Sequence, residues 1–352
     1  MEKYKSDYKD YSGYVGIMIS TDRSIFLEKS AVRARMVEHA KLYKKLHIII
    51  FSINRFEQEN ISENCIIHST NSFSRLQYVS DARRIGKKII KDLDKDMPVI
   101  FTCQDPFETG LAGKVLACSR KKSELLLQIH TDLFSPYFTA TQIGLRNAFL
   151  NRIRLFISKS TLPQADAIRV VSTKIANSLV ERGIASEKII IKPIAVRANT
   201  LLSQNPTLDL REKFPQFKII ILMVSRLEPE KNIGMALDAM KILLGRVPDA
   251  GLVIVGSGSK MQSLKKHAYK LKIEASVAFV GWQTDIIPYY RGCDIFLMTS
   301  WYEGYGMVLK EAQSMACRIV STDVGIAKEV GARIVGYGHE SIADGLTQSL
   351  NI

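Results

Sequence analysis

Two acidic residues at a fixed spacing are the first candidates for chemistry in this sequence. Glu303 and Glu311 lie eight positions apart, after the apolar run 295–298, and Gly304 and Gly306 lie between them. This pattern predicts a glycine-bounded loop that leads from a buried strand into a helix. Backbone N–H groups at a helix start bind anions or hydroxyls. Glu303 falls in the loop, where an exposed carboxylate is ordinary.

Glu311 needs a separate explanation, because it falls on the apolar side of the predicted helix. The spacing i, i+3, i+4, i+7 joins Val308, Glu311, Ala312 and Met315. A carboxylate on that side is costly unless a partner hydrogen-bonds it. Two explanations are equally open: Glu311 binds a ligand, or it is an internal helix cap or salt-bridge partner.

Two cations precede these acids in the chain. Arg226 and Lys231 follow a strand-like run and come directly before a predicted helix. Cations at the carboxyl end of a strand, next to the positive end of a helix dipole, suit a diphosphate. The alternative is a solvated loop in which both cations pair with Glu228 and Glu230. This stretch alone slightly favours the alternative.

Glycines follow two further predicted strands. The Gly-Ser-Gly run at 256–258 either lets a phosphate or base approach the backbone or forms a tight turn. Gly281 and Trp282 also follow a strand. The indole of Trp282 would stack on a base, or it would fill an interface or the core.

His130 is the candidate in the first half of the chain. It comes directly after the apolar run 125–129 and is followed by Asp132. This places an imidazole and a carboxylate at the carboxyl end of a strand. A lone histidine is more often structural than catalytic, so the functional interpretation is the minority one.

Apolar runs of strand length alternate with helical patterns along most of the chain. Such alternation predicts parallel sheets covered on both faces. In the first half we expect strands at 14–19, 47–51, 98–102, 125–129 and 167–171, with helices at 30–45, 75–91 and 143–159. In the second half we expect strands at 219–224, 252–255, 277–280, 295–298 and 318–321, with helices at 233–244, 261–271 and 307–316.

The alternation lapses between Pro193 and Pro215. This lapse predicts an interdomain linker. The expected fold class is therefore α/β, with two tandem Rossmann-like doubly wound domains at 1–198 and 199–352 and a ligand-binding cleft between them.

Composition limits the classes of partner. Residues 1–200 hold 32 Lys and Arg against 20 Asp and Glu, whereas residues 201–352 hold 17 against 15. A basic first half suits nucleic acid, anionic lipid or an acidic substrate. The five cysteines show no C-x-x-C pairing, the N-terminus is charged, and no apolar run spans a bilayer. We expect a cytoplasmic protein with reduced thiols.

Residues 147–159 interleave Phe149, Ile153 and Phe156 with Arg152 and Arg154. A basic amphipathic helix can lie on an anionic membrane surface. The commoner alternative is a helix that packs its apolar side on the sheet.

In combination, these motifs resemble the retaining glycosyltransferases of family 4, which have the two-domain GT-B fold. The resemblance is strongest over residues 219–330, and it is carried by the order and spacing of the motifs. It runs from Arg226 and Lys231, through the Gly-Ser-Gly run and Gly281, to Glu303, Gly304, Tyr305, Gly306 and Glu311.

The resemblance implies a role for each candidate residue. Arg226 and Lys231 would hold the diphosphate of a nucleotide-sugar donor, and Glu311 would accept hydrogen bonds from the ribose. Glu303 would contact hydroxyls of the sugar, and the amides of 304–306 would lie near sugar and phosphate. Gly281 and Trp282 would read the base, and His130 would help to position the sugar. The implied reaction needs no metal and no cofactor beyond the donor, which is a substrate.

The acceptor implied by the resemblance is a glycan or a lipid-linked hydroxyl, and the basic half would favour an inner membrane surface. Many family members carry a Gly-Gly loop after the first strand, whereas residues 20–24 here contain no glycine. Residues 341–352 allow only a short final helix. Two alternatives remain open: a sugar-nucleotide epimerase on the same fold, and a basic nucleic-acid-binding protein. No nucleic-acid-binding motif is present, so we expect no nucleic-acid partner.

Overall fold

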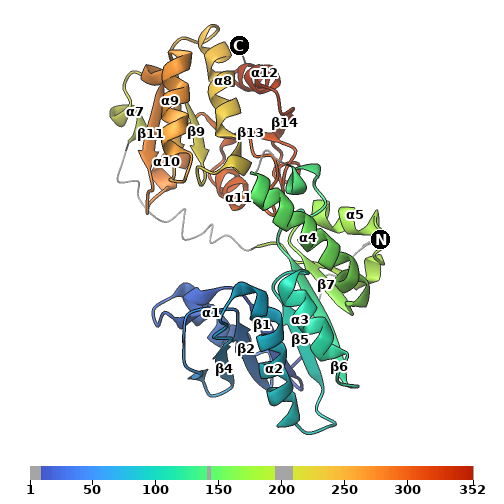
Figure 1. The fold of residues 1–352 in the computed structure, drawn as a ribbon. Helices are drawn as coiled ribbons and strands as arrows, with labels where there is room; N and C mark the ends of the chain where they lie inside the picture. The colour runs from blue at the N-terminus through green and yellow to red at the C-terminus, as the bar shows by residue number, and fades with distance from the viewer. Residues whose placement is uncertain (1–8, 141–143, 195–208, 352) are drawn as a thin grey trace. The chain divides into compact units, whose positions relative to one another are not determined.

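The computed structural model describes residues 9–140, 144–194 and 209–351. The chain divides into two compact units: unit 1 comprises Met1–His130 and Phe149–Lys192, and unit 2 comprises Thr131–Ala148 and Pro193–Ile352. The expected boundary between residues 198 and 199 lies outside the described residues. Each unit is built around one open sheet flanked by helices (Figure 1), which confirms the expectation of two doubly wound α/β domains.

Unit 1 contains an eight-stranded sheet in the order β3-β4-β2-β1-β5-β6-β7-β8. Neighbouring strands are parallel except for the antiparallel pair β3 and β4. The sequence pattern does not predict β3, which is a polar edge strand, or β4, which has only three consecutive apolar residues. The strands are β1 (Val15–Ser20), β2 (Lys45–Ile50), β3 (Glu59–Ser62), β4 (Cys65–Ser69), β5 (Val99–Cys103), β6 (Ser123–Ile129), β7 (Ala167–Val170) and β8 (Ile189–Ile191).

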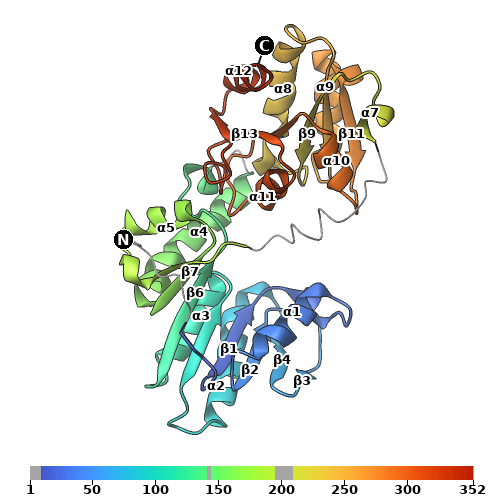
Figure 2. The same cartoon turned by 180° about the vertical axis from the view of Figure 1, so that it is seen from behind.

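Helices cover both faces of this sheet. Helices α2 and α3 pack side by side on one face (Figure 1), whereas α1 packs on the other, against apolar side chains of β2 and β4 (Figure 2). The Ser30 hydroxyl accepts a hydrogen bond from Arg33 N–H at 3.1 Å and thereby caps the N-terminus of α1. The predicted helix 30–45 is too long, because Lys45 already belongs to β2. The helices are α1 (Ala31–Ala40), α2 (Tyr78–Lys91), α3 (Glu108–Ala117), α4 (Leu145–Thr161) and α5 (Thr173–Val180).

Unit 2 contains a six-stranded parallel sheet in the order β11-β10-β9-β12-β13-β14. The strands are β9 (Ile219–Val224), β10 (Ala250–Val255), β11 (Val277–Gly281), β12 (Ile295–Met298), β13 (Arg318–Thr322) and β14 (Arg333–Val335). The helices are α7 (Leu210–Lys213), α8 (Ile233–Leu244), α9 (Met261–Leu271), α10 (Ile287–Gly292), α11 (Met307–Ser314) and α12 (His339–Ser349). Helix α12 packs beside α8 within this unit (Figures 1 and 2).

The strand order of unit 2 reverses direction at β9. The chain runs outward from β9 through β10 to β11, and then returns to place β12 on the other side of β9. In open α/β sheets, ligands bind at such a switch point, outside the carboxyl ends of the strands. The loops after β9 and β12 therefore form the best-placed candidate site of unit 2.

Candidate functional site

The loop after β9 and the loop after β12 are joined by hydrogen bonds. Trp301 N–H donates to the Glu230 carbonyl at 2.8 Å. The Thr299 hydroxyl contacts the carbonyls of Lys231 and Asn232, each at 3.1 Å. The two loops therefore form one surface at the carboxyl edge of the sheet, although they lie far apart in the sequence.

Lys231 and Glu303 form an ion pair within this surface. The Lys231 Nζ lies 2.5 Å from Glu303 Oε1, and the two side chains are only 14% and 13% exposed. The Ser300 hydroxyl donates to the same carboxylate oxygen at 2.8 Å. A mostly buried ion pair is stable only with good geometry and further hydrogen bonds, and the Ser300 hydroxyl supplies one. The alternative in which Lys231 pairs with Glu228 or Glu230 is therefore wrong.

Arg226 lies at the rim of the same surface. Its side chain is 69% exposed, and its Nη2 lies 2.9 Å from Glu230 Oε1. Glu228 instead accepts hydrogen bonds from the backbone and hydroxyl of Ser259, at 2.9 and 2.7 Å. The solvated-loop alternative therefore holds for Arg226, which pairs with an acid of its own loop, but not for Lys231. Because the guanidinium is largely exposed to solvent, the ion pair contributes little free energy, and Arg226 can exchange Glu230 for a stronger anion.

Glu311 has a neutral partner. The Tyr290 hydroxyl donates to Glu311 Oε2 at 2.8 Å. Burial, and then the charge of Glu311, raise the pKa of the Tyr290 phenol, so the phenol stays protonated as a donor. No ion pair involves Glu311 in the part of the chain that the structure describes. The salt-bridge explanation is therefore wrong, and the ligand explanation remains a prediction.

The glycine-rich turn before α11 is held by close backbone contacts. Gly306 is the residue that precedes α11, and the side chain of Tyr305 is buried. Gly325 has a φ of +50°, and a Cβ on it would lie 2.4 Å from the Tyr305 carbonyl oxygen. Only glycine fits there, so Gly325 allows the turn at 304–306 to pack closely on the next loop.

The glycines that follow β10 and β11 differ in role. A Cβ on Gly256 would lie 1.9 Å from the Ser225 carbonyl oxygen, at a φ of +132°. The Gly-Ser-Gly run is thus required for packing against the loop after β9. Gly281 ends β11, and Trp282 is 71% exposed. The core explanation for Trp282 is therefore wrong, whereas stacking on a base remains a prediction.

Two buried polar atoms lie in the loop that carries the cations. The Ser225 hydroxyl and the Asn232 side-chain amide nitrogen have no hydrogen-bond partner among the described residues. A buried polar group without a partner costs free energy, and such groups are rare in folded proteins. Both residues flank the segment that holds Arg226 and Lys231, so a ligand with acceptor oxygens would satisfy them.

His130 belongs to unit 1 and lies at the end of β6. Its Nε2 lies 3.3 Å from Gln128 Oε1. The His130 side chain is partly exposed to solvent, and desolvation by the surrounding protein, and then the charge of Arg169, lower its pKa, which favours the neutral imidazole. The structure thus places His130 at the carboxyl edge of its own sheet, as the sequence predicts.

Sequence reasoning misses an aromatic cluster next to the Glu303 loop. Tyr137 lies 4.8 Å from both Trp301 and Tyr337, measured between ring centroids, and Trp301 stacks on Tyr337 at 5.2 Å. Tyr137 belongs to the segment Thr131–Ala148, which packs in unit 2 although it precedes most of unit 2 in the sequence. No local pattern reveals a contact between residues so far apart.

The described residues offer no ready set of ligands for a metal centre. Within residues 9–140, 144–194 and 209–351, no group of three or more His, Cys, Asp or Glu side chains is arranged to hold a metal ion. The charged groups of the unit 2 site instead include two cations, Arg226 and Lys231, which suit an anionic ligand.

The comparison with known families agrees with this geometry. Residues 206–338 match the family of group 1 glycosyl transferases. The matched region contains both loops of the switch point and every candidate site residue of unit 2.

Two curated proteins are similar in sequence to parts of this chain. The chain is 30% identical over 122 residues to the Escherichia coli UDP-Gal:alpha-D-GlcNAc-diphosphoundecaprenol alpha-1,3-galactosyltransferase, covering 33% of this chain and 32% of that protein. It is 28% identical over 240 residues to the Campylobacter jejuni N-acetylgalactosamine-N,N'-diacetylbacillosaminyl-diphospho-undecaprenol 4-alpha-N-acetylgalactosaminyltransferase, covering 67% and 60%. The matches thus span about a third of the first glycosyltransferase and less than two thirds of the second.

A solved structure has a similar fold over nearly all of this chain. The Anabaena protein Alr3699/HepE in complex with UDP and glucose superposes with a TM-score of 0.67 at 15% identity, covering 96% of this chain and 90% of that one. At this identity the likeness concerns the fold. The chain therefore has the GT-B fold, with two tandem Rossmann-like domains.

Proposed function

We propose that this protein is a retaining glycosyltransferase that moves a sugar from a nucleoside-diphosphate sugar to a hydroxyl acceptor in glycan or glycolipid synthesis. The observation that carries the proposal is the buried Lys231 ammonium, paired with Glu303 at the switch point of unit 2. The names of the similar proteins support it, because one includes a UDP-sugar donor and another a bound UDP.

The donor would bind along the two joined loops. Arg226 and Lys231 would hold the diphosphate, and the unpaired Asn232 amide would donate to one of its oxygens. Glu311 would accept from the ribose hydroxyls, while Tyr290 holds its other oxygen in place. Gly281 and the exposed Trp282 would meet the base.

The chemistry would consist mainly of positioning and charge stabilisation. Glu303 would bind hydroxyls of the sugar near the reacting carbon, oriented by Lys231 and Ser300. As the diphosphate departs, Arg226 and Lys231 would neutralise its growing charge. The leaving oxygen would assist deprotonation of the acceptor on the same face, so that the anomeric configuration is kept. His130 would help to position the sugar, and the proposal requires no metal ion.

The acceptor side is proposed for unit 1, at an anionic membrane surface on the cytoplasmic side. Helix α4 exposes Phe149 and Phe156, at 61% and 76%, among basic residues such as Arg152. Exposed aromatic rings next to cations suit the boundary of an anionic bilayer. None of the helices in the described ranges is long and apolar enough to cross a membrane.

A transfer assay tests this function. The protein would be incubated with labelled UDP-, GDP- and ADP-sugars and a lipid extract, and the label would be followed into the lipid phase. We expect transfer from one donor, with the anomeric configuration of that donor in the product. An altered free sugar without acceptor would indicate an epimerase, and inversion of configuration would contradict the retaining mechanism.

A further inference from the structure

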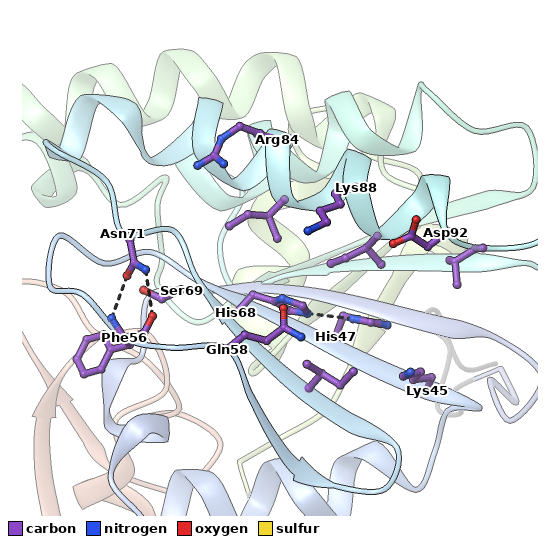
Figure 3. A pocket seen from close by; sticks show the side chains of 14 residues that line it. Lys45, His47, Phe56, Gln58, His68, Ser69, Asn71, Arg84, Lys88 and Asp92 are labelled. Carbon is purple, nitrogen blue, oxygen red and sulfur yellow. Dashed lines mark hydrogen bonds between the residues drawn. The ribbon is translucent and has the colours of Figure 1, made fainter.

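Unit 1 contains a pocket whose lining residues are separate from those of the proposed donor site of unit 2. Its volume is about 610 Å³, and it lies between strands β2 and β4 and helix α2 (Figure 3). The apolar residues of β2 and β4 such as Leu46, Ile48 and Ile67 face the core under α1. Lys45 and His47 of β2, and Ile66 and His68 of β4, alternate with them and line the pocket on the opposite face of the sheet. This volume is typical of pockets that bind small organic molecules.

The pocket is lined by more cations than acids. Lys45 from β2 lies on one side, Arg84 and Lys88 from α2 lie on the other, and Asp92 is the single carboxylate of the lining (Figure 3). Arg84 has a long contact with Asp81, at 3.4 Å. Neither Lys45 nor Lys88 has an ion-pair partner among the described residues. The excess of two positive charges favours an anion that carries two negative charges.

The floor of the pocket is a pair of buried histidines. His47 Nδ1 lies 3.0 Å from His68 Nε2, and the rings stack with centroids 5.3 Å apart (Figure 3). Burial lowers the pKa of both rings to about 4, so both are neutral at neutral pH. One ring must donate to the other. In either tautomer the pair therefore keeps one further N–H donor and one acceptor nitrogen for a ligand.

Polar and apolar groups share the remaining wall. The Ser69 hydroxyl is buried and has no hydrogen-bond partner among the described residues. Ile66 from β4, and Ile85 and Ile89 from α2, supply an apolar surface beside the cations. A ligand with an anionic head and an apolar body would satisfy both parts of the wall.

We propose that this pocket binds a phosphate monoester with an apolar body, with the phosphate between Lys45, Lys88 and Arg84 and the body against Ile85 and Ile89. A phosphate monoester carries close to two negative charges at pH 7 and offers three acceptor oxygens. The Ser69 hydroxyl and the free imidazole N–H would donate to these oxygens. The proposal does not rest on the proposed transferase function, because every residue of the pocket belongs to unit 1.

Hexyl phosphate, used as a soluble probe, tests the proposal in the full-length protein. We expect it to shift the side-chain NMR signals of His47 and His68 and to bind more tightly than hexyl sulfate or hexanol. Vesicles of phosphatidylcholine with phosphatidic acid form the second arm. Competition between these vesicles and hexyl phosphate would identify a lipid headgroup as the source, and indifference to the vesicles would identify a soluble ester.

Two double variants supply the matched comparison. Lys45→Gln with Lys88→Gln removes two lining cations, whereas Lys44→Gln with Lys87→Gln removes two exposed cations from adjacent positions that do not line the pocket. We expect the first pair to weaken hexyl phosphate binding at least about tenfold and the second to change it by less than about twofold. Unshifted histidine signals in the wild type, or equal affinity in both double variants, would overturn the proposal.

Discussion

Lys231 and Glu303 are 72 positions apart in the sequence, yet their charged atoms lie 2.5 Å apart at the centre of the unit 2 site. The contact exists because β9 and β12 are neighbours in the sheet, so that the loops after them meet. The pair links the proposed diphosphate cation to the proposed sugar-binding carboxylate. A change in either residue should therefore affect both stability and donor binding.

Lys231→Ala should lower the free energy of unfolding by about 3 kcal/mol, because it leaves the Glu303 carboxylate mostly buried without its cation. Adding Glu303→Gln should recover part of this loss, since an amide needs no counter-charge. Urea unfolding of the two single variants and the double variant measures the coupling. Lys270→Ala, in an exposed position of α9, is the control. Strict additivity would show that the pair contributes no coupling free energy.

Glu311→Gln should separate binding from stability. The Gln side-chain oxygen can still accept from the Tyr290 hydroxyl, so the free energy of unfolding should change by less than about 1 kcal/mol. Loss of the carboxylate should weaken nucleotide binding about tenfold or more, because hydrogen bonds to a charged acceptor are the stronger ones. Isothermal titration calorimetry measures the affinity, and unchanged affinity would remove Glu311 from the donor site.

Asp105, two residues after the end of β5, should make the stability of the protein depend on pH. Burial raises the pKa of its carboxyl from 3.8 to about 6, so the folded state binds the proton more tightly than the unfolded state does. The contribution of Asp105 to the free energy of unfolding therefore rises as pH falls from about 6 to about 4, because the folded protein takes up the proton first. Asp105→Asn keeps an acceptor for Phe107 N–H and should stabilise the protein at pH 8 by on the order of 3 kcal/mol. Near pH 3.5 the variant and the wild type should differ little. A difference that does not vary with pH would contradict this.

His47 and His68 should have the opposite effect on stability, which should fall as the pH is lowered. The pKa of His47 and of His68 is about 4 in the folded protein, below the ordinary value of 6.5, so the unfolded state binds protons more readily. Their contribution to stability is therefore present above pH 6.5 and is lost as pH falls towards 4. NMR titration of the ring carbons should show both rings neutral down to about pH 5. Protonation of either ring near pH 6.5 would contradict the burial that lowers its pKa.

Much of the fold can be read from the sequence because its elements are locally encoded. The continuous apolar runs of β9 and β12 and the periodic pattern of α8 give the observed bounds. The sequence pattern predicts the wrong end for α1. This helix stops at Ala40, because the chain must turn before β2 begins at Lys45. The polar edge strand β3 has no apolar signal of its own.

The site is less predictable than the fold. Residue type and spacing identify Lys231, Glu303 and Glu311 as candidates, but their partners depend on strand order. Acids of its own loop are the alternative partners for Lys231 in the sequence, whereas the strand order brings Glu303 to it. The partner of Glu311 is a buried Tyr290 from α10, which no charge pattern reveals.

The most direct test of the donor site is a thermal-shift measurement with UDP, GDP, ADP and their common sugars. A ligand that binds only the folded state raises the unfolding temperature according to its affinity. We predict that at least one nucleotide raises this temperature for the wild type and for Lys270→Ala, and that Lys231→Ala and Glu311→Gln lose most of the shift. No shift with any nucleotide, or a full shift in both Lys231→Ala and Glu311→Gln, would contradict the proposed donor site.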